Sequence, residues 1–355
     1  MVTKGFWAGK NVLVTGHTGF KGSWLALWLD SLGARVTGYA LEPASKPSLW
    51  ALAGAKSGVA STIADIRDLG ALQRAVKAVR PEVVFHLAAQ SLVRQSYDDP
   101  VGTYASNVMG TVHLLEAVRH EPAVRAVVNV TSDKCYQNLE TGQAYREDDP
   151  MGGRDPYSSS KGCAELVTTA YRASFFSREG EPALASARAG NVIGGGDWAA
   201  DRIVPDMVRA TASGRSVLVR NPRAIRPWQH VLEPVSGYLQ LAERLLSAPK
   251  DHAEGWNFGP DAEDAVSVEV IVSTIARLWG PPAGWTADKG SHPHEAHFLK
   301  LDSAKARSRL GWRPRLRLQS ALEWTVDWYK KQAQGGDARS LTLEQIERYM
   351  RLPPA

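Results

Sequence analysis

The chain has 355 residues, of which 44% are hydrophobic and 22% are charged, and its formal net charge is +5. This length predicts two domains, and the composition is that of a globular protein rather than a disordered chain. The first residues are too polar for a signal peptide and no apolar run approaches a membrane span, so we expect a cytoplasmic protein. The positive charge favours anionic partners, but no lysine- and arginine-rich block indicates nucleic-acid binding.

A strand, a glycine-rich turn and a helix are expected near the amino terminus. Residues 12–15 are apolar or β-branched, Gly16, Gly19 and Gly22 follow, and an apolar helical stretch continues to residue 32. The first glycines let the backbone turn sharply and approach a pyrophosphate. The last lets the helix pack closely on the strand, and the helix amino terminus supplies N–H groups. This order of elements predicts a dinucleotide-binding site.

The same alternation continues to about residue 189. Valine-rich runs at 36–39, 82–87 and 127–131 predict buried parallel strands, and helices are expected at 69–79, 103–119 and 159–176. The pattern predicts an α/β fold with a doubly wound, Rossmann-type parallel sheet. Beyond residue 190 the pattern is irregular, and its last clear amphipathic helix covers 319–331.

The expected domain division follows from this change of pattern. A dinucleotide-binding domain would cover 1–189 and be completed by part of 231–260. A smaller substrate-binding domain would contain 190–230 and 261–355.

Polar residues that can carry chemistry follow the predicted strands. Tyr157 and Lys161 share one helix face because they are four residues apart. A neighbouring ammonium favours phenolate, so we expect Lys161 to lower the pKa of Tyr157 from its reference of about 10. Tyr157 could then accept a proton from an alcohol. Asp65 and Asp68 follow another short strand-like stretch, and they suit an adenine contact and a helix cap, respectively.

These features together resemble the extended short-chain dehydrogenase/reductase family and, within it, the nucleotide-sugar 4,6-dehydratases. The resemblance runs from residue 11 to about 329. It is carried by the glycine triplet, Ala88-Ala89-Gln90, Asn107, Ser132-Asp133-Lys134, Tyr157-x-x-x-Lys161 and Arg188-Ala189-Gly190-Asn191.

The resemblance implies roles for five residues. Tyr157, helped by Ser132 and Lys161, would take the proton of the sugar 4-hydroxyl while C4 gives hydride to NAD. Asp133 would protonate the departing 6-hydroxyl. Lys134 stands where many 4,6-dehydratases carry glutamate as the base for the C5 proton. A lysine acts as a base only when it is neutral, so Lys134 is either that base or an electrostatic stabiliser of the enolate.

The family's internal hydride return implies NAD. However, no aspartate follows the second strand, the nearest acid is Glu42, and His17 and Lys21 would suit an extra phosphate, so NADP stays open. The candidate cofactor-binding residues are Gly16, His17, Gly19, Phe20, Lys21, Gly22, Asp65, Ile66, Ala88, Ala89, Gln90 and Asn107.

The implied substrate is a nucleoside diphosphate sugar whose base the residues do not identify. Arg226 and His230 match the family's phosphate-contacting stretch, Asn191 would bind phosphate or sugar, and Arg202 would lie at the entrance. We expect no bound metal, although His292, His294 and His297 superficially resemble a metal cluster.

The resemblance also implies a homodimer that pairs through the helices near 103–119 and 159–176. Two other functions stay open: a nucleotide-sugar 4-epimerase and a non-catalytic dinucleotide-sensing protein. The epimerases share the tyrosine, lysine and NAD but usually lack the pair Asp133-Lys134.

Overall fold

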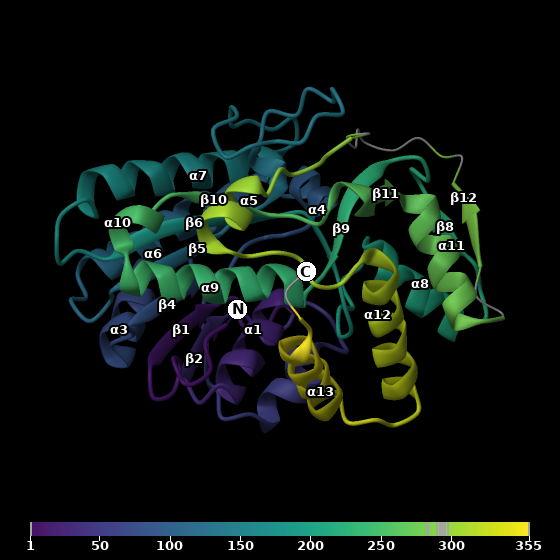
Figure 1. Cartoon of the computed structure of the whole chain (residues 1–355), viewed down its shortest axis with the longest axis horizontal. Coiled ribbons are helices and arrows are strands. Elements are labelled where there is room, and N and C mark those ends of the chain that lie inside the picture. The colour runs from purple at the N-terminus through teal and green to yellow at the C-terminus, as the bar shows by residue number, and fades with distance from the viewer. Residues whose placement is uncertain (1, 282–283, 289, 291–295, 297, 354–355) are drawn as a thin grey trace.

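The computed structural model describes residues 2–281, 284–288, 290, 296 and 298–353. Its centre is a seven-stranded sheet with the order β10-β6-β5-β4-β1-β2-β3 (Figure 1). Every neighbouring pair in this sheet is parallel, so the predicted doubly wound sheet is confirmed. The strands are β1 (Asn11–Thr15), β2 (Arg35–Ala40), β3 (Ala60–Ile63), β4 (Val83–His86), β5 (Ala126–Val130), β6 (Ala183–Ala189) and β10 (Gly255–Phe258).

The inner strands of the sheet are buried on both faces, which explains their continuous apolar sequences, whereas the edge strand β3 is exposed. In β1, Val12 and Val14 enter one hydrophobic cluster, whereas Leu13 enters the other. The first cluster lies under α1 (Phe20–Ser31) and α9 (Leu232–Ser247), and the second under α3 (Leu69–Val79), α6 (Gly110–Arg119) and α7 (Pro156–Phe175).

The small strands β8, β11 and β12 and the helices α8 and α11 lie together at one side of the molecule (Figure 1). Two small sheets have the orders β11-β9-β7 and β12-β8. Their strands are β7 (Asn191–Ile193), β8 (Val217–Val219), β9 (Ile225–His230), β11 (Ala265–Ser267) and β12 (Trp285–Ala287). The other α-helices are α2 (Leu49–Ala53), α4 (Val93–Asp98), α5 (Pro100–Tyr104), α8 (Ile203–Ala212), α10 (Pro249–His252), α11 (Val268–Trp279), α12 (Leu318–Ala333) and α13 (Ala338–Arg351). The division into two domains stays a prediction.

Several predicted helices differ from those observed. The helix expected at 103–119 consists of the end of α5, a π-helical turn at Ala105–Met109 and α6. Helix α7 begins before residue 159, because Asp155 caps it and Pro156 occupies its first turn. The expectation that 319–331 holds the last clear amphipathic helix is wrong. Helix α13 follows that helix. Only a narrow stripe of α13 is buried, and its many charged residues make the amphipathic pattern difficult to recognise in the sequence.

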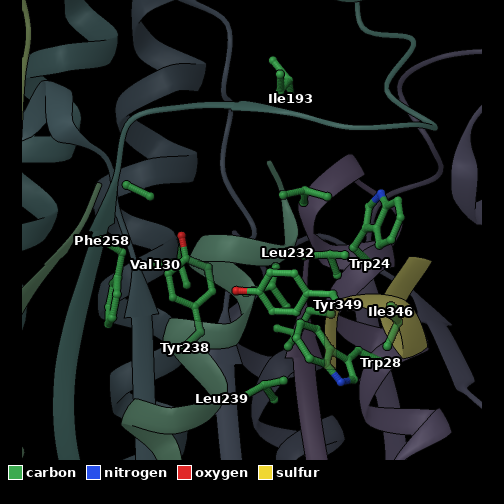
Figure 2. Close-up of a cluster of buried hydrophobic side chains, with 14 of the residues drawn as sticks. Trp24, Trp28, Val130, Ile193, Leu232, Tyr238, Leu239, Phe258, Ile346 and Tyr349 are labelled. Atoms are coloured by element: carbon green, nitrogen blue, oxygen red, sulfur yellow. The ribbon is translucent and has the colours of Figure 1, made fainter. Parts of the chain in front are cut away.

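This last helix packs against the first. Tyr349 of α13 meets Trp28 of α1 edge-to-face, with ring centroids 5.7 Å apart (Figure 2). Its hydroxyl donates to the buried carboxylate of Glu233 in α9 at 2.7 Å, and burial raises the pKa of Glu233 to about 7. These two contacts of Tyr349 join α13 to α1 and α9. They therefore help to hold α1, the helix that follows the glycine-rich turn.

Among the described residues, no helix combines the length and the apolar character needed to cross a membrane.

Candidate functional site

A cavity of about 950 Å³ opens at the carboxyl ends of the central strands. This is where ligands of open parallel α/β sheets bind. Its lining contains every predicted catalytic, cofactor-binding and substrate-binding residue except His17, Asn107 and His230.

The glycine-rich turn can be built only with glycine at two positions. Gly16 has a φ of +76°, and a Cβ there would lie 2.7 Å from the backbone nitrogen of Ala88. A Cβ on Gly22 would lie 2.1 Å from the carbonyl oxygen of Gly16. Gly19 caps α1 without a side chain, so the first N–H groups of the helix face the cavity rather than a capping oxygen. These N–H groups fit the pyrophosphate of a dinucleotide.

Two acidic residues that follow β3 have different roles. Asp68 accepts a hydrogen bond from the backbone N–H of Ala71 at 2.8 Å, so its predicted capping role is confirmed. Asp65 lines the cavity and is held by a forked contact with Arg67, which lowers the pKa of the carboxyl. Its backbone carbonyl also accepts the Tyr39 hydroxyl at 2.9 Å.

Three candidate residues lie outside the cavity lining. His17 packs against Gly38 and Trp50 and shares a 2.7 Å hydrogen bond with Ser61. Burial lowers its pKa to about 4, so the ring is neutral near pH 7.

The second, Asn107, lies in the π-helical turn. Its side chain bonds the backbone N–H and C=O of Gln90 and the hydroxyl of Ser160. Asn107 therefore holds the loop that follows β4 in place through the backbone of Gln90.

The third, His230, is fully buried and meets Trp24 and Trp324 edge-to-face. Burial lowers its pKa to about 3, and the structure does not bring its ring to the cavity where a phosphate would lie.

The predicted catalytic residues come from two neighbouring elements. Ser132, Asp133 and Lys134 follow β5, whereas Tyr157 and Lys161 lie in the first turns of α7. The Lys161 Nζ atom is 5.9 Å from the centroid of the Tyr157 ring. A buried network of charged and hydroxyl side chains holds α7 beside the end of β5.

A buried ion pair connects these elements beneath the cavity. Glu165, one turn beyond Lys161, meets Arg188 of β6 at 2.8 Å. Glu165 also accepts the hydroxyls of Thr131 and Ser186. Burial alone would raise the pKa of Glu165, but Arg188 and these hydroxyl donors hold it below its usual value. The network sets the position of α7 relative to the end of β5.

The expected lowering of the Tyr157 pKa is wrong for the protein alone. Burial raises the pKa of Tyr157 to about 12, and the hydrogen bond with Ser132 opposes this only in part. Burial also lowers the pKa of Lys161 to about 8. Desolvation disfavours the charged form of both groups and is the largest cause of each shift.

Asp133 is suited to donate a proton. Burial raises the pKa of its carboxyl, while Lys134, Ser132, Arg226 and Lys21 oppose that shift. Its Oδ1 atom accepts the Ser132 hydroxyl at 2.9 Å, and Oδ2 has no hydrogen-bond partner among the described residues. A carboxyl whose protonated form is favoured in this way is suited to protonate a leaving group.

Lys21 extends from the glycine-rich turn to the catalytic end of the cavity. Its Nζ atom lies 5.9 Å from the centroid of the Tyr238 ring. Burial, followed by repulsion from Lys161 and Arg202, lowers its pKa to about 8. Sequence reasoning missed Tyr238, because a tyrosine in a long apolar helix carries no motif.

The far wall of the cavity is cationic. Arg202 pairs with Asp197 at 3.0 Å and donates to the Ser91 hydroxyl. Arg226 of β9 donates to the carbonyls of Ile225 and Ala296, and Asn191 begins the adjacent β7. Asp197 was not found from the sequence. His292, His294 and His297 lie outside the described residues.

Comparisons with known proteins agree with this geometry. The family model described as GDP-mannose 4,6 dehydratase matches residues 13–325. The chain belongs to this family. A CDP-glucose 4,6-dehydratase from Salmonella typhimurium is 53% identical over 354 residues, which is 99% of each chain. The predicted resemblance to nucleotide-sugar 4,6-dehydratases is therefore confirmed.

Solved structures show the same fold. The epimerase Mth375 of Methanothermobacter thermautotrophicus has a TM-score of 0.81 at 24% identity, covering 95% of this chain and 96% of its own. The UDP-glucose 4-epimerase of Thermus thermophilus, solved as a complex with NAD, has a TM-score of 0.77 at 25% identity. That match covers 90% of this chain and 98% of the epimerase.

Proposed function

We propose that this protein dehydrates CDP-glucose to the 4-keto-6-deoxy sugar nucleotide, with NAD as its cofactor. The observation that carries the proposal is the buried acid Asp133 beside Ser132, Tyr157 and Lys161, in a chain 53% identical to a CDP-glucose 4,6-dehydratase. The sequences at 16–22, 132–134 and 226–231 favour the same branch of the family.

Each step uses one group at the cavity. Tyr157 takes the O4 proton. A dinucleotide held at the glycine-rich turn would supply the hydride acceptor for C4 and the hydride donor for C6. The 4-ketone makes the C5 proton acidic, and Asp133 protonates the departing 6-hydroxyl as water leaves. Lys134 takes the C5 proton or, if it stays charged, stabilises the enolate.

NAD rather than NADP is supported at the adenosine end of the cavity. His17 is buried, neutral and bonded to Ser61, and the Lys21 side chain lies at the opposite, catalytic end. Glu42 lines the cavity shortly after β2. A carboxylate in this region suits ribose hydroxyls and repels a 2′-phosphate.

The 4-epimerase is the second candidate, because the epimerase of Thermus thermophilus shares the fold and binds NAD. An epimerase needs no acid for a leaving hydroxyl, so the buried carboxyl of Asp133 favours dehydration. A non-catalytic sensor would have no need for the intact set of Ser132, Tyr157 and Lys161.

A homodimer is supported by apolar side chains on neighbouring helices. Val101 of α5 is 78% exposed and Leu166 of α7 is 61% exposed. Tyr97 of α4 and Phe175 of α7 are also exposed, and α4 and α5 both pack against α7. An apolar surface of this kind on helices is typical of a four-helix interface.

The activity is tested by incubating the protein with NAD and CDP-glucose in heavy water. We expect a product that has lost one water and gained one deuterium at C5, measured by mass spectrometry and NMR. Retained mass with inverted C4 would identify an epimerase, and no change with any nucleoside diphosphate glucose would favour the sensor.

The roles of Asp133 and Lys134 are separated by matched variants. We expect Asp133→Asn to slow water loss by on the order of 10²- to 10⁴-fold while C4 oxidation persists, because only the acid is removed. Lys134→Ala should stop C5 proton exchange. Lys134→Arg keeps the charge but cannot act as a base, so exchange at the normal rate in either Lys134 variant would exclude lysine as the base.

Cofactor choice is tested by titrating the protein with each dinucleotide and following binding by calorimetry. We expect NAD to bind more tightly than NADP, because Glu42 lines the adenosine end of the cavity and would repel a 2′-phosphate, and the Arg67 side chain that also lines it is paired with Asp65. Much tighter binding of NADP would contradict this assignment.

The dimer is tested by sedimentation. Val101→Glu combined with Leu166→Glu should convert a dimer into monomers, because charges would replace the most exposed apolar side chains of the two helices. The matched control is Leu218→Glu, which changes an exposed leucine of β8 remote from these helices. Dimers that persist in the double variant would place the interface elsewhere.

A further inference from the structure

The loop that joins β7 to α8 is tied to the central sheet by two polar contacts at the cavity. Arg94 of α4 donates from Nη1 to the Asp201 Oδ1 atom at 3.1 Å, and Arg202 Nη2 donates to Ser91 Oγ at 3.0 Å. Ser91 and Arg94 both follow β4, and all four residues line the cavity. The loop therefore meets the part of the cavity wall that the central sheet carries.

The same carboxylate oxygen also holds an arginine from a different part of the wall. Arg220, which follows β8, donates from Nη1 to Asp201 Oδ1 at 3.1 Å. Strand β8 belongs to one of the two small sheets, whereas α4 follows a strand of the central sheet. Asp201 thus lies between two guanidinium groups that come from separate elements of the fold.

This three-residue bridge is partly open to solvent. The exposed fractions of the side chains are 45% for Arg94, 40% for Asp201 and 21% for Arg220. Ion pairs that are this exposed are weak, because water screens them. An anion with more charge can therefore replace the carboxylate. A diphosphate is such an anion, and guanidinium groups bind phosphate oxygens in pairs.

The residues assigned to the substrate diphosphate lie along the same wall. Arg202 is the direct neighbour of Asp201 in the chain, and Arg226 lines the same cavity. His230, which was also predicted to contact phosphate, is buried away from the cavity. The predicted set of phosphate contacts therefore lacks one member, and the bridge offers cations in its place.

We propose that Asp201 is an anionic placeholder for the diphosphate of the substrate, and that Arg94 and Arg220 are diphosphate-binding residues. This inference rests on the proposed function, which supplies the nucleoside diphosphate. Before the substrate enters, Asp201 holds the two guanidinium groups in place. When the substrate binds, its phosphates take the position of the carboxylate between Arg94 and Arg220.

The backbone at Asp201 suggests the substitution that tests this role. Asp201 has a φ of +60°, which lies in the left-handed region. Asparagine adopts this conformation about as readily as aspartate does. Asp201→Asn therefore removes the charge and keeps the shape of the side chain and of the loop.

The test is a calorimetric titration of the protein with CDP in the presence of NAD. Asp201→Asn should bind CDP about 3- to 10-fold more tightly than wild-type protein, because no carboxylate competes for the two arginines. Arg94→Gln and Arg220→Gln should each weaken CDP binding by about 10-fold. Asp201→Asn should bring no tightening to protein that already carries both arginine substitutions.

A matched control has the same change in net charge at another surface. Asp327 of α12 is 50% exposed, pairs with Lys331 at 2.9 Å and lies outside the described lining of the cavity. Asp327→Asn should leave the affinity for CDP unchanged. All variants should bind NAD with the wild-type affinity, which the same calorimetry measures.

The placeholder is wrong if Asp201→Asn weakens CDP binding or leaves it unchanged, or if the tightening persists without the two arginines. Failure of the proposed function gives a different result. Wild-type protein that binds CDP but forms no product from CDP-glucose would refute the dehydration, and the titration would still decide the role of Asp201. Wild-type protein that does not bind CDP would refute both.

Discussion

The buried ion pair between Glu165 and Arg188 is the contact on which the catalytic arrangement depends. It joins α7, which carries Tyr157 and Lys161, to β6, and through Thr131 it reaches the end of β5. Both side chains are almost fully buried, so removing one would leave an uncompensated charge at a cost of about 3 to 5 kcal/mol. The pair therefore sets the position of α7 relative to the end of β5, and the proposed chemistry uses side chains from both segments.

The same burial explains the protonation states of the site. Desolvation disfavours every isolated charge, so it raises the pKa of Asp133 and Tyr157 and lowers that of Lys21 and Lys161. The shift at Asp133 favours the protonated carboxyl that a leaving group requires, whereas Tyr157 must be helped to lose its proton. A positively charged nicotinamide would supply such help, and the glycine-rich turn positions a dinucleotide at the same cavity.

Much of the fold could be predicted because its signals are local. The strand at 12–15, the glycine spacing and the helix at 69–79 depend on residues that are close in sequence, and the structure contains all three. Helix α13 was missed because only a narrow stripe of it is buried, and that stripe becomes recognisable only when α1 packs against it. His17 lies in the glycine-rich turn, yet packing against Gly38 turns its ring away from the cavity.

By itself, the sequence determined the parallel sheet and the dinucleotide turn, since spacing along a strand or helix sets which side chains share a face. Its resemblance to the nucleotide-sugar 4,6-dehydratases indicated which residues carry the chemistry. Only the tertiary structure decided the charge state of these groups and their partners. It buried Asp133 beside Ser132, directed Lys21 to the catalytic end and kept His230 from the cavity. Desolvation and long-range contacts depend on which distant segments meet, and that information is absent from any local pattern.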